Sequence, residues 1–336
     1  MKKWLFILSI ILILGGLELY FRHRYPITYI SPNIYQHDKK VGYRYIPNGK
    51  YYSEKQVVHF NKYGYIGPDW SIKKDSSIFR IAFLGPCELT GALLVKDTVK
   101  YNFPTLIQEE FFKKKYRIEV LNFGVDGGDR SYYNFELIKQ DVLQFNPDLI
   151  ILLNELPFSA VDYTRETYLG YLIIYPMGEV NSKKKAEEWA IILNRYKPFV
   201  FILNNCHILK AIAKYYYHRN KNSLAKFLGY SDQKKIIIPD GNTAIRYSVE
   251  ESIKMIKELN DSLAKRNSKF YLLEFECDKH SSDFYSKKDL PVLFLMCNFT
   301  SEKFYPEDLH FNNLGQIEFK KQLIKILLPL IPAKYK

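Results

Sequence analysis

The residue types that could do chemistry lie where apolar segments end. Cys87 directly follows an apolar run, residues 81–84, and a tight Gly-Pro turn, so a strand would present a thiol at its carboxyl end. Such strand ends are where α/β sheets place ligands and catalytic groups. A second predicted strand, residues 118–122, ends two residues before Gly124, and the acidic residues and histidine of 307–310 lie near the chain's end. A nucleophile, a backbone donor and an acid–base pair are therefore candidates.

His310 could act as a general base only if a neighbouring group fixes its tautomer and stabilises the cation that forms. Asp308, two residues earlier, can turn back to do this from the same loop, and Glu307 is the fallback. A structural interpretation stays open beside this one. The same stretch is typical of a turn in which Asn312 or Asn313 caps the following helix, and both roles can coexist.

The order of these segments resembles the SGNH (GDSL-type) hydrolases, in particular the membrane-anchored bacterial branch that modifies envelope polysaccharides. The resemblance extends from about Val41 to the C terminus. The family block G-D-S-F-T-F-G corresponds to residues 85–91, and the block L-N-x-G-V-x-G to residues 121–127. The Pro-Asp pair of the third strand corresponds to residues 147–148, and D-x-H-x-N-x-x-G to residues 308–315.

This resemblance implies an enzyme that hydrolyses or transfers acyl esters without a metal or other cofactor. Cys87 takes the position of the nucleophilic serine, His310 that of the base and Asp308 that of the residue that orients the base. The oxyanion donors would be the backbone N–H groups of Cys87 and Gly124, with the side chain of Asn154 as a third. The implied substrate is an acylated glycan or another ester.

Two departures from the family pattern bear on activity. A cysteine replaces the serine, which is chemically competent because a thiolate is a strong nucleophile. However, Glu88 places negative charge beside the thiol, and Pro86 removes one backbone N–H from the turn. The oxyanion asparagine expected about ten residues after Pro147 falls on Pro157, and losing such a donor typically costs about 100- to 1,000-fold in rate. The alternative is thus a catalytically inactive glycan-binding or assembly subunit.

The composition limits the number of domains, the kind of partner and the cysteine chemistry that we expect. The chain has 336 residues, of which 47% are hydrophobic and 16% aromatic, enough to bury the core of one catalytic domain. The net charge of +13 suits an anionic partner, but the lysines are scattered, so nucleic-acid binding is not expected. No C-x-x-C pair or metal-ligand spacing occurs, and we expect free buried thiols, although two could pair after export. The four cysteines are Cys87, Cys206, Cys277 and Cys297, and Cys277 and Cys297 are the two that could pair.

The N-terminal segment predicts a membrane anchor. Two lysines precede the apolar residues 4–17, and the stretch reaches about eighteen residues if 18–21 are included. Bulky residues follow Gly16 where a signal-peptide cleavage site would need small ones, so we expect an uncleaved helix. The flanking charges do not decide the orientation, and the resemblance places the C-terminal domain outside, in the periplasm or extracellular space. A cytoplasmic domain that binds anionic lipid is the remaining alternative.

We expect three parts: an anchor at 1–23, a β-rich lead-in at 24–77, and an α/β domain at 78–336 with an insertion at about 155–245. The lead-in tyrosines either line a substrate groove or pack against the sheet edge. Apolar runs and helical spacings alternate in the third part, which predicts a doubly wound parallel sheet. The expected strands are 81–84, 118–122, 149–153, 270–276 and 291–296, and the expected helices are 103–111, 135–145, 206–219, 249–263 and 314–330.

Overall fold

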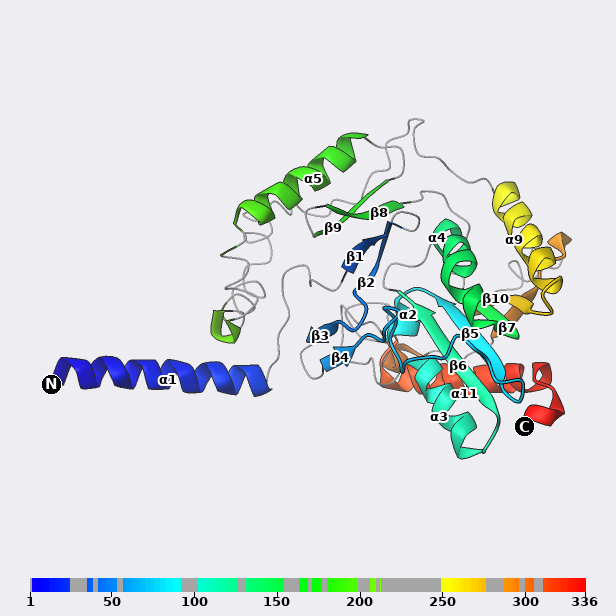
Figure 1. Cartoon of the computed structure of the whole chain (residues 1–336), viewed down its shortest axis with the longest axis horizontal. Helices are drawn as coiled ribbons and strands as arrows, with labels where there is room; N and C mark the ends of the chain where they lie inside the picture. The colour runs from blue at the N-terminus through cyan, green and yellow to red at the C-terminus, as the bar shows by residue number, and fades with distance from the viewer. Residues whose placement is uncertain are drawn as a thin grey trace.

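The structure is a computed structural model of the whole chain (Figure 1). The residues that it describes are 2–24, 35–38, 42–52, 57–91, 102–125, 131–153, 163–168, 171–176, 180–196, 198, 206–209, 212, 249–275, 287–295, 300–304 and 311–336.

The centre of the fold is a five-stranded parallel sheet with the order β11-β10-β7-β5-β6. The first strand along the chain, β5, therefore lies between the second and the third. β6 pairs with one edge of β5, and β7 pairs with the other edge, so the direction in which strands are added reverses at β5. This reversal makes a topological switch point at the carboxyl ends of β5 and β7. The strands are β5 (Phe79–Gly85), β6 (Ile118–Gly124), β7 (Leu149–Leu153), β10 (Lys269–Phe275) and β11 (Val292–Leu295).

Helices cover both faces of this sheet, which explains why β5 is buried along its whole length. Ile81 and Phe83 point into a core with α2 (Cys87–Thr90), α3 (Phe103–Lys113) and α11 (Asn313–Leu330). Ala82 and Leu84 point into the opposite core, which α4 (Ser131–Leu137) and α9 (Val249–Ala264) cover (Figure 1). A π-helical turn at Ile138–Val142 and a 3-10 turn at Leu143–Phe145 continue α4. The doubly wound α/β prediction is confirmed.

The lead-in forms two antiparallel hairpins, and its aromatic side chains enter the second core. Tyr43, Tyr45, Tyr65 and Trp70 are all buried there. The rings of Tyr65 and Trp70 lie 4.8 and 5.0 Å from that of Phe123 on β6. These tyrosines therefore do not line a groove, and they pack on the face of the sheet rather than on its edge. The hairpins are β1 (Tyr35–Asp38) with β2 (Gly42–Tyr45), and β3 (Lys50–Tyr52) with β4 (Val57–His59).

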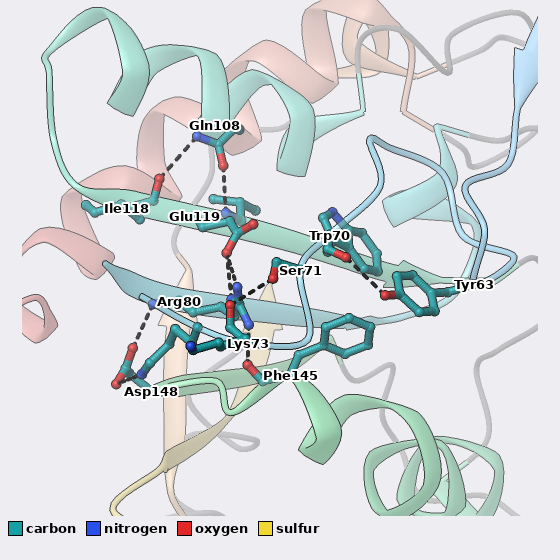
Figure 2. Close-up of polar contacts among 12 residues, drawn as sticks. Tyr63, Trp70, Ser71, Lys73, Arg80, Gln108, Ile118, Glu119, Phe145 and Asp148 are labelled. Atoms are coloured by element: carbon teal, nitrogen blue, oxygen red, sulfur yellow. Dashed lines mark hydrogen bonds and ion pairs between the residues drawn. The ribbon is translucent and has the colours of Figure 1, made fainter. Parts of the chain in front are cut away.

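A polar cluster fixes the amino end of β5, opposite the edge that carries Cys87 (Figure 2). The guanidinium of Arg80, only 2% exposed, donates to Glu119 Oε2 at 2.6 Å and to the carbonyl of Phe145. The backbone N–H of Arg80 donates to Asp148 Oδ2 at 2.7 Å, and Lys74 Nζ pairs with the same carboxylate at 2.6 Å. Asp148, half of the Pro-Asp pair, thus has a structural role in joining β5 to β7.

The predicted helices agree with the structure in most places. The buried residues of α9 are those that its periodicity predicts, and α11 begins one residue before the expected position. On α11, Ile317 is 43% exposed, whereas Phe319 is buried. In the predicted helix 206–219, the described residues 207–209 and 212 are helical, and the remainder lies outside the described residues.

The insertion contains elements that the sequence analysis did not predict. A hairpin is formed by β8 (Tyr163–Tyr168) and β9 (Tyr171–Pro176), and α5 (Val180–Arg195) follows it. Strand β8 lies beside β1 and β2 of the lead-in (Figure 1). The insertion and the lead-in are therefore neighbours, although more than a hundred residues separate β2 from β8 in sequence.

The N-terminal helix α1 (Lys2–Arg24) extends away from this core (Figure 1). Its stretch Lys3–Phe21 is long and apolar enough to cross a membrane, and the stretch is not buried inside the protein. A signal sequence can have the same properties, so the anchor remains a proposal.

Candidate functional site

Cys87 lies at the carboxyl edge of the sheet, at the switch point. Gly85 ends β5 with φ +148°, a conformation that residues with a β-carbon rarely adopt, and Pro86 then leads into the single turn of α2. Cys87 is the first residue of that turn and is half-buried. In the register of β5 and β6, Gly85 pairs with Gly124. The prediction that Cys87 and Gly124 share one edge of the sheet is confirmed.

The backbone of Gly124 is already engaged in this structure. Its N–H donates to Asn122 Oδ1 at 2.9 Å, while Asn122 Nδ2 donates to the carbonyl of Leu89 at 2.9 Å. A β-carbon on Gly124 would overlap the side chain of Leu89 in α2, so close packing alone explains the glycine. The oxyanion role of Gly124 remains a prediction, and it requires Asn122 to release or share that N–H. Asn122 is the asparagine of the block matched to residues 121–127, but no role was assigned to it from the sequence.

The thiol of Cys87 faces a carboxylate. Its Sγ lies 3.5 Å from Oε2 of Glu88, and Glu88 is 9% exposed. An adjacent negative charge favours the protonated thiol over the thiolate because ionisation would place two like charges side by side. The concern that the sequence raised about Glu88 therefore applies to the folded protein, where the carboxylate points at the thiol.

The predicted acid–base residues, Glu307, Asp308 and His310, lie outside the described residues, but the chain on either side of them is fixed. Phe304 and Phe311 form an antiparallel bridge, with their ring centroids 5.2 Å apart. Phe304 and Phe311 thus lie side by side in the fold.

Asn312 contacts Phe304 and also caps the next helix. Its Nδ2 donates to the carbonyl of Phe304 at 3.0 Å, while its Oδ1 accepts the N–H groups of Leu314 and Gly315 at 2.9 and 3.1 Å. The capping interpretation of the last block is confirmed for Asn312. It leaves the role of His310 as a prediction, since a capping asparagine and a basic histidine can belong to one loop.

Gln316 connects this C-terminal block to the Cys87 turn. It lies in the first turn of α11 and is 1% exposed. Its Nε2 donates to the backbone carbonyl of Glu88 at 3.0 Å, and its Oε1 accepts the backbone N–H of Phe103 at 2.9 Å. The chain that follows His310 is therefore joined to the residue next to Cys87. The sequence carried a signal for this, since Gln316 occupies the same helix face as the buried Phe319 and Leu323.

The end of β7 packs against the same turn. A β-carbon on Gly85 would lie 2.8 Å from Cβ of Leu153, the last residue of β7. Asn154 follows Leu153 directly, but Asn154 and Pro157 lie outside the described residues, as do Cys277 and Cys297. Among the residues that the structure describes, no three His, Cys, Asp or Glu side chains are grouped so as to hold a metal ion.

No protein-family model matches the sequence, and no curated protein matches it. Solved structures do match, among them a GDSL-like lipase from Bacteroides thetaiotaomicron, which is 9% identical with a TM-score of 0.37 over 78% of this chain and 93% of that chain. A lipase/acylhydrolase from Enterococcus faecalis is 10% identical, with a TM-score of 0.40 over 76% and 98%. A two-domain esterase active on acetylated mannans is 12% identical, with a TM-score of 0.39 over 77% and 51%. At these values the similarity carries no inference about activity, which has to come from the chain's own residues.

Proposed function

We propose that this chain is a membrane-anchored, SGNH-like acyl-ester hydrolase or O-acyltransferase that acts on acyl groups of an envelope or extracellular polysaccharide. The observation that carries the proposal is the pair of hydrogen bonds made by Gln316, which join the C-terminal block to the turn that bears Cys87. Nucleophile and base come from opposite ends of the domain sequence, so a buried connection between those ends is what this chemistry requires.

In the proposed reaction, His310 takes the thiol proton as Cys87 Sγ attacks the acyl carbonyl, and Asp308 orients the imidazole. The carbonyl oxygen becomes an oxyanion, for which N–H groups at the strand ends and Asn154 are the candidate donors. The intermediate collapses by expelling the sugar oxygen, which takes the proton back from His310. The resulting thioester on Cys87 is then attacked by water in a hydrolase or by an acceptor hydroxyl in a transferase.

The alternative is a catalytically inactive glycan-binding or assembly subunit with the same fold. Two contacts favour it. The carboxylate of Glu88 faces the thiol of Cys87, and the N–H of Gly124 is held by Asn122. The first opposes formation of the thiolate, and the second occupies a donor that an oxyanion would need.

Covalent trapping separates the two candidates. The chain without α1 would be incubated with an activated acetyl ester, and peptides would be examined by mass spectrometry for a thioester. An enzyme acquires the acetyl group on Cys87, and the rate falls when His310 is replaced by alanine. Cys206→Ser is the matched control and should change nothing. If Cys87 acquires no acetyl group and alkylates no faster than Cys206, and if His310→Ala has no effect, the inactive subunit is the correct interpretation.

A Cys87→Ser variant then locates the defect of a weak enzyme. If only the nucleophile differs from an efficient site, restoring the hydroxyl raises ester hydrolysis. If the missing oxyanion donor is the defect, the serine variant gains nothing, because a nucleophile without stabilisation of the transition state is not rescued by a change of its own acidity.

A further inference from the structure

Glu18 stands out in the apolar helix α1. It is the single acidic residue between Lys3 and Arg22 in the sequence. Ionisable residues within a membrane-spanning helix are costly and almost always have a partner in the protein or reach water. A partner for Glu18 is therefore required if α1 crosses a membrane, and the structure supplies one.

The partner is a short helical segment of the insertion, residues 206–209. The carboxylate of Glu18 accepts the backbone N–H of His207 at 2.9 Å through Oε1 and that of Ile208 at 3.0 Å through Oε2. Nδ1 of His207 lies 3.1 Å from Oε1, and Sγ of Cys206 lies 3.6 Å from Oε2. Both carboxylate oxygens are thus engaged by one segment. Cys206 was expected to pack in the core and instead faces this carboxylate.

Burial along α1 marks the same place. Of the described positions 3–21, all are exposed except Glu18 and Phe21, which are partly covered. These two residues are three apart and so lie on one face of the helix, in its last turns. The rest of α1 is left clear for lipid, while this one patch is covered by protein.

The depth of the patch follows from helix geometry. At a rise of about 1.5 Å per residue, the stretch 3–21 spans about 28 Å, close to the thickness of the hydrocarbon core. Glu18 lies three residues, about 4.5 Å, before the end of that stretch. Its polar partners must lie at the same level, which is the boundary between hydrocarbon and headgroups.

We propose that residues 206–209 dock on α1 at Glu18 and hold the insertion against the membrane surface. The contact satisfies the one acidic charge within the apolar stretch of the anchor and fixes how the α/β domain is oriented over the bilayer. The proposal rests on the anchor part of the proposed function and is independent of catalysis. Because two of the donors are backbone N–H groups, the contact persists in either charge state of His207.

Disulfide trapping tests the contact in the full-length chain in isolated membranes. Cys87, Cys277 and Cys297 are changed to serine, so that Cys206 is the remaining thiol, and a second thiol is introduced as Glu18→Cys. Leu19→Cys is the matched control, since Leu19 is 68% exposed and points about 100° away around the helix. On mild copper-catalysed air oxidation, we expect an intramolecular disulfide to form at least about tenfold faster with Glu18→Cys than with Leu19→Cys.

A second arm covers the case in which the substitution itself breaks the contact. Trypsin cleavage after Lys210 is compared among the parent chain, Glu18→Gln, Glu18→Leu and Leu19→Ala. We expect Glu18→Leu to accelerate cleavage about tenfold, Glu18→Gln to have a smaller effect because its carbonyl still accepts, and Leu19→Ala to have none.

The rates of disulfide formation and of trypsin cleavage are interpreted together. Rapid intramolecular disulfide formation, or faster cleavage in Glu18→Leu, supports docking. A disulfide that forms only between two chains, or equal disulfide rates for the two cysteine variants, overturns it when cleavage of Glu18→Leu is also unchanged. Carbonate extraction of the same membranes separates this result from the anchor itself. Release into the wash refutes the anchor, whereas the disulfide still reports whether Glu18 meets Cys206.

Discussion

The thiol of Cys87 lies 3.5 Å from a carboxylate that is itself mostly buried. A working cysteine nucleophile is normally placed beside a cation, which stabilises the thiolate and so favours loss of the thiol proton. The Glu88 carboxylate does the opposite, and a substrate or a protonated His310 would have to offset it. Glu88 is therefore the residue on which the balance between an enzyme and an inactive subunit depends most directly.

Replacing Glu88 by glutamine tests this balance. The substitution keeps the size of the side chain and removes its charge, so the thiolate of Cys87 becomes more accessible. We expect the alkylation rate of Cys87 by iodoacetamide at neutral pH to rise about three- to tenfold. Glu109→Gln, on an exposed position of α3, is the control and should leave the rate unchanged. An unaltered rate in Glu88→Gln would mean that the carboxylate does not govern the thiol.

The backbone conformation and close packing explain the glycines of the motifs. Gly85 and Gly91 both have positive φ, at +148° and +70°. A β-carbon on Gly124 would overlap Leu89, and one on Gly315 would overlap the carbonyl of Lys303. Each glycine is thus required by a turn or a close approach in the fold. Their presence reflects the backbone geometry around the site, and it does not by itself indicate chemistry.

At the scale of elements, Gln316 holds α11, α2 and the start of α3 together. Replacing it by alanine removes two buried hydrogen bonds, one to the carbonyl of Glu88 and one from the N–H of Phe103. Losing one partner of a buried hydrogen bond typically costs about 1–3 kcal/mol, so we expect a loss of about 2–4 kcal/mol in the free energy of unfolding. Chemical denaturation of the chain without α1 measures it.

Gln322→Ala is the matched control on the same helix. The Gln322 side chain donates to Glu318 one turn earlier and accepts from Lys325 at the surface. Its loss should cost less than about 0.5 kcal/mol. Equal stabilities for Gln316→Ala and Gln322→Ala would show that the buried connection contributes little, and would remove the main support for bringing His310 to Cys87.

The elements that the sequence predicted share a strong local signal. The apolar runs 81–84 of β5 and 149–153 of β7 are unbroken because helices cover both faces of the sheet, and the buried residues of α9 recur at helical spacing. The hairpin β8–β9 was missed because its strands, rich in tyrosine, mix polar and apolar residues without a clean alternation.

The candidate site was predicted in part, for a similar reason. The turn with Cys87 could be read from a strand followed by Gly-Pro, since that signal is local. The charge of Glu88 beside the thiol could also be read, because the two residues are adjacent in sequence. The contacts of Gln316 and Asn122 could not, because each depends on which side chains the tertiary structure brings to the carboxyl edge. A polar residue on the apolar face of a helix, as at Gln316, is the type of signal that could have identified one of them.

At the scale of the whole molecule, α1 decides where the protein is located. If it is an uncleaved anchor, the full-length chain stays in the membrane fraction after washing with high salt and with carbonate, since a largely apolar stretch of 19 residues must leave the bilayer for release. A chain that begins at Arg24 should be soluble. Recovery of the full-length chain in either wash would contradict the anchor, and N-terminal sequencing would reveal a cleaved signal peptide.

The lead-in packs together with the α/β domain in one core. Its side chains Tyr43, Tyr45, Tyr65 and Trp70 share one core with β5, β6 and β7. Asp141, in the π-helical turn of the α/β domain, accepts from the Tyr65 hydroxyl and pairs with Arg44 at 3.0 Å. Burial of four such side chains contributes about 6–12 kcal/mol as an upper estimate, which is comparable to the whole stability of a domain.

We therefore expect a chain that begins at residue 78 not to fold, because the face of the sheet around Phe123 would be exposed to water. A chain that begins at Tyr35 retains every one of those side chains, and it should unfold cooperatively at a temperature close to that of the chain that begins at Arg24. Size-exclusion chromatography and thermal unfolding monitored by circular dichroism measure both. If the chain that begins at residue 78 is monomeric and unfolds at the same temperature as the longer ones, the lead-in is a dispensable attachment, and the shared core contributes little to the stability of the domain.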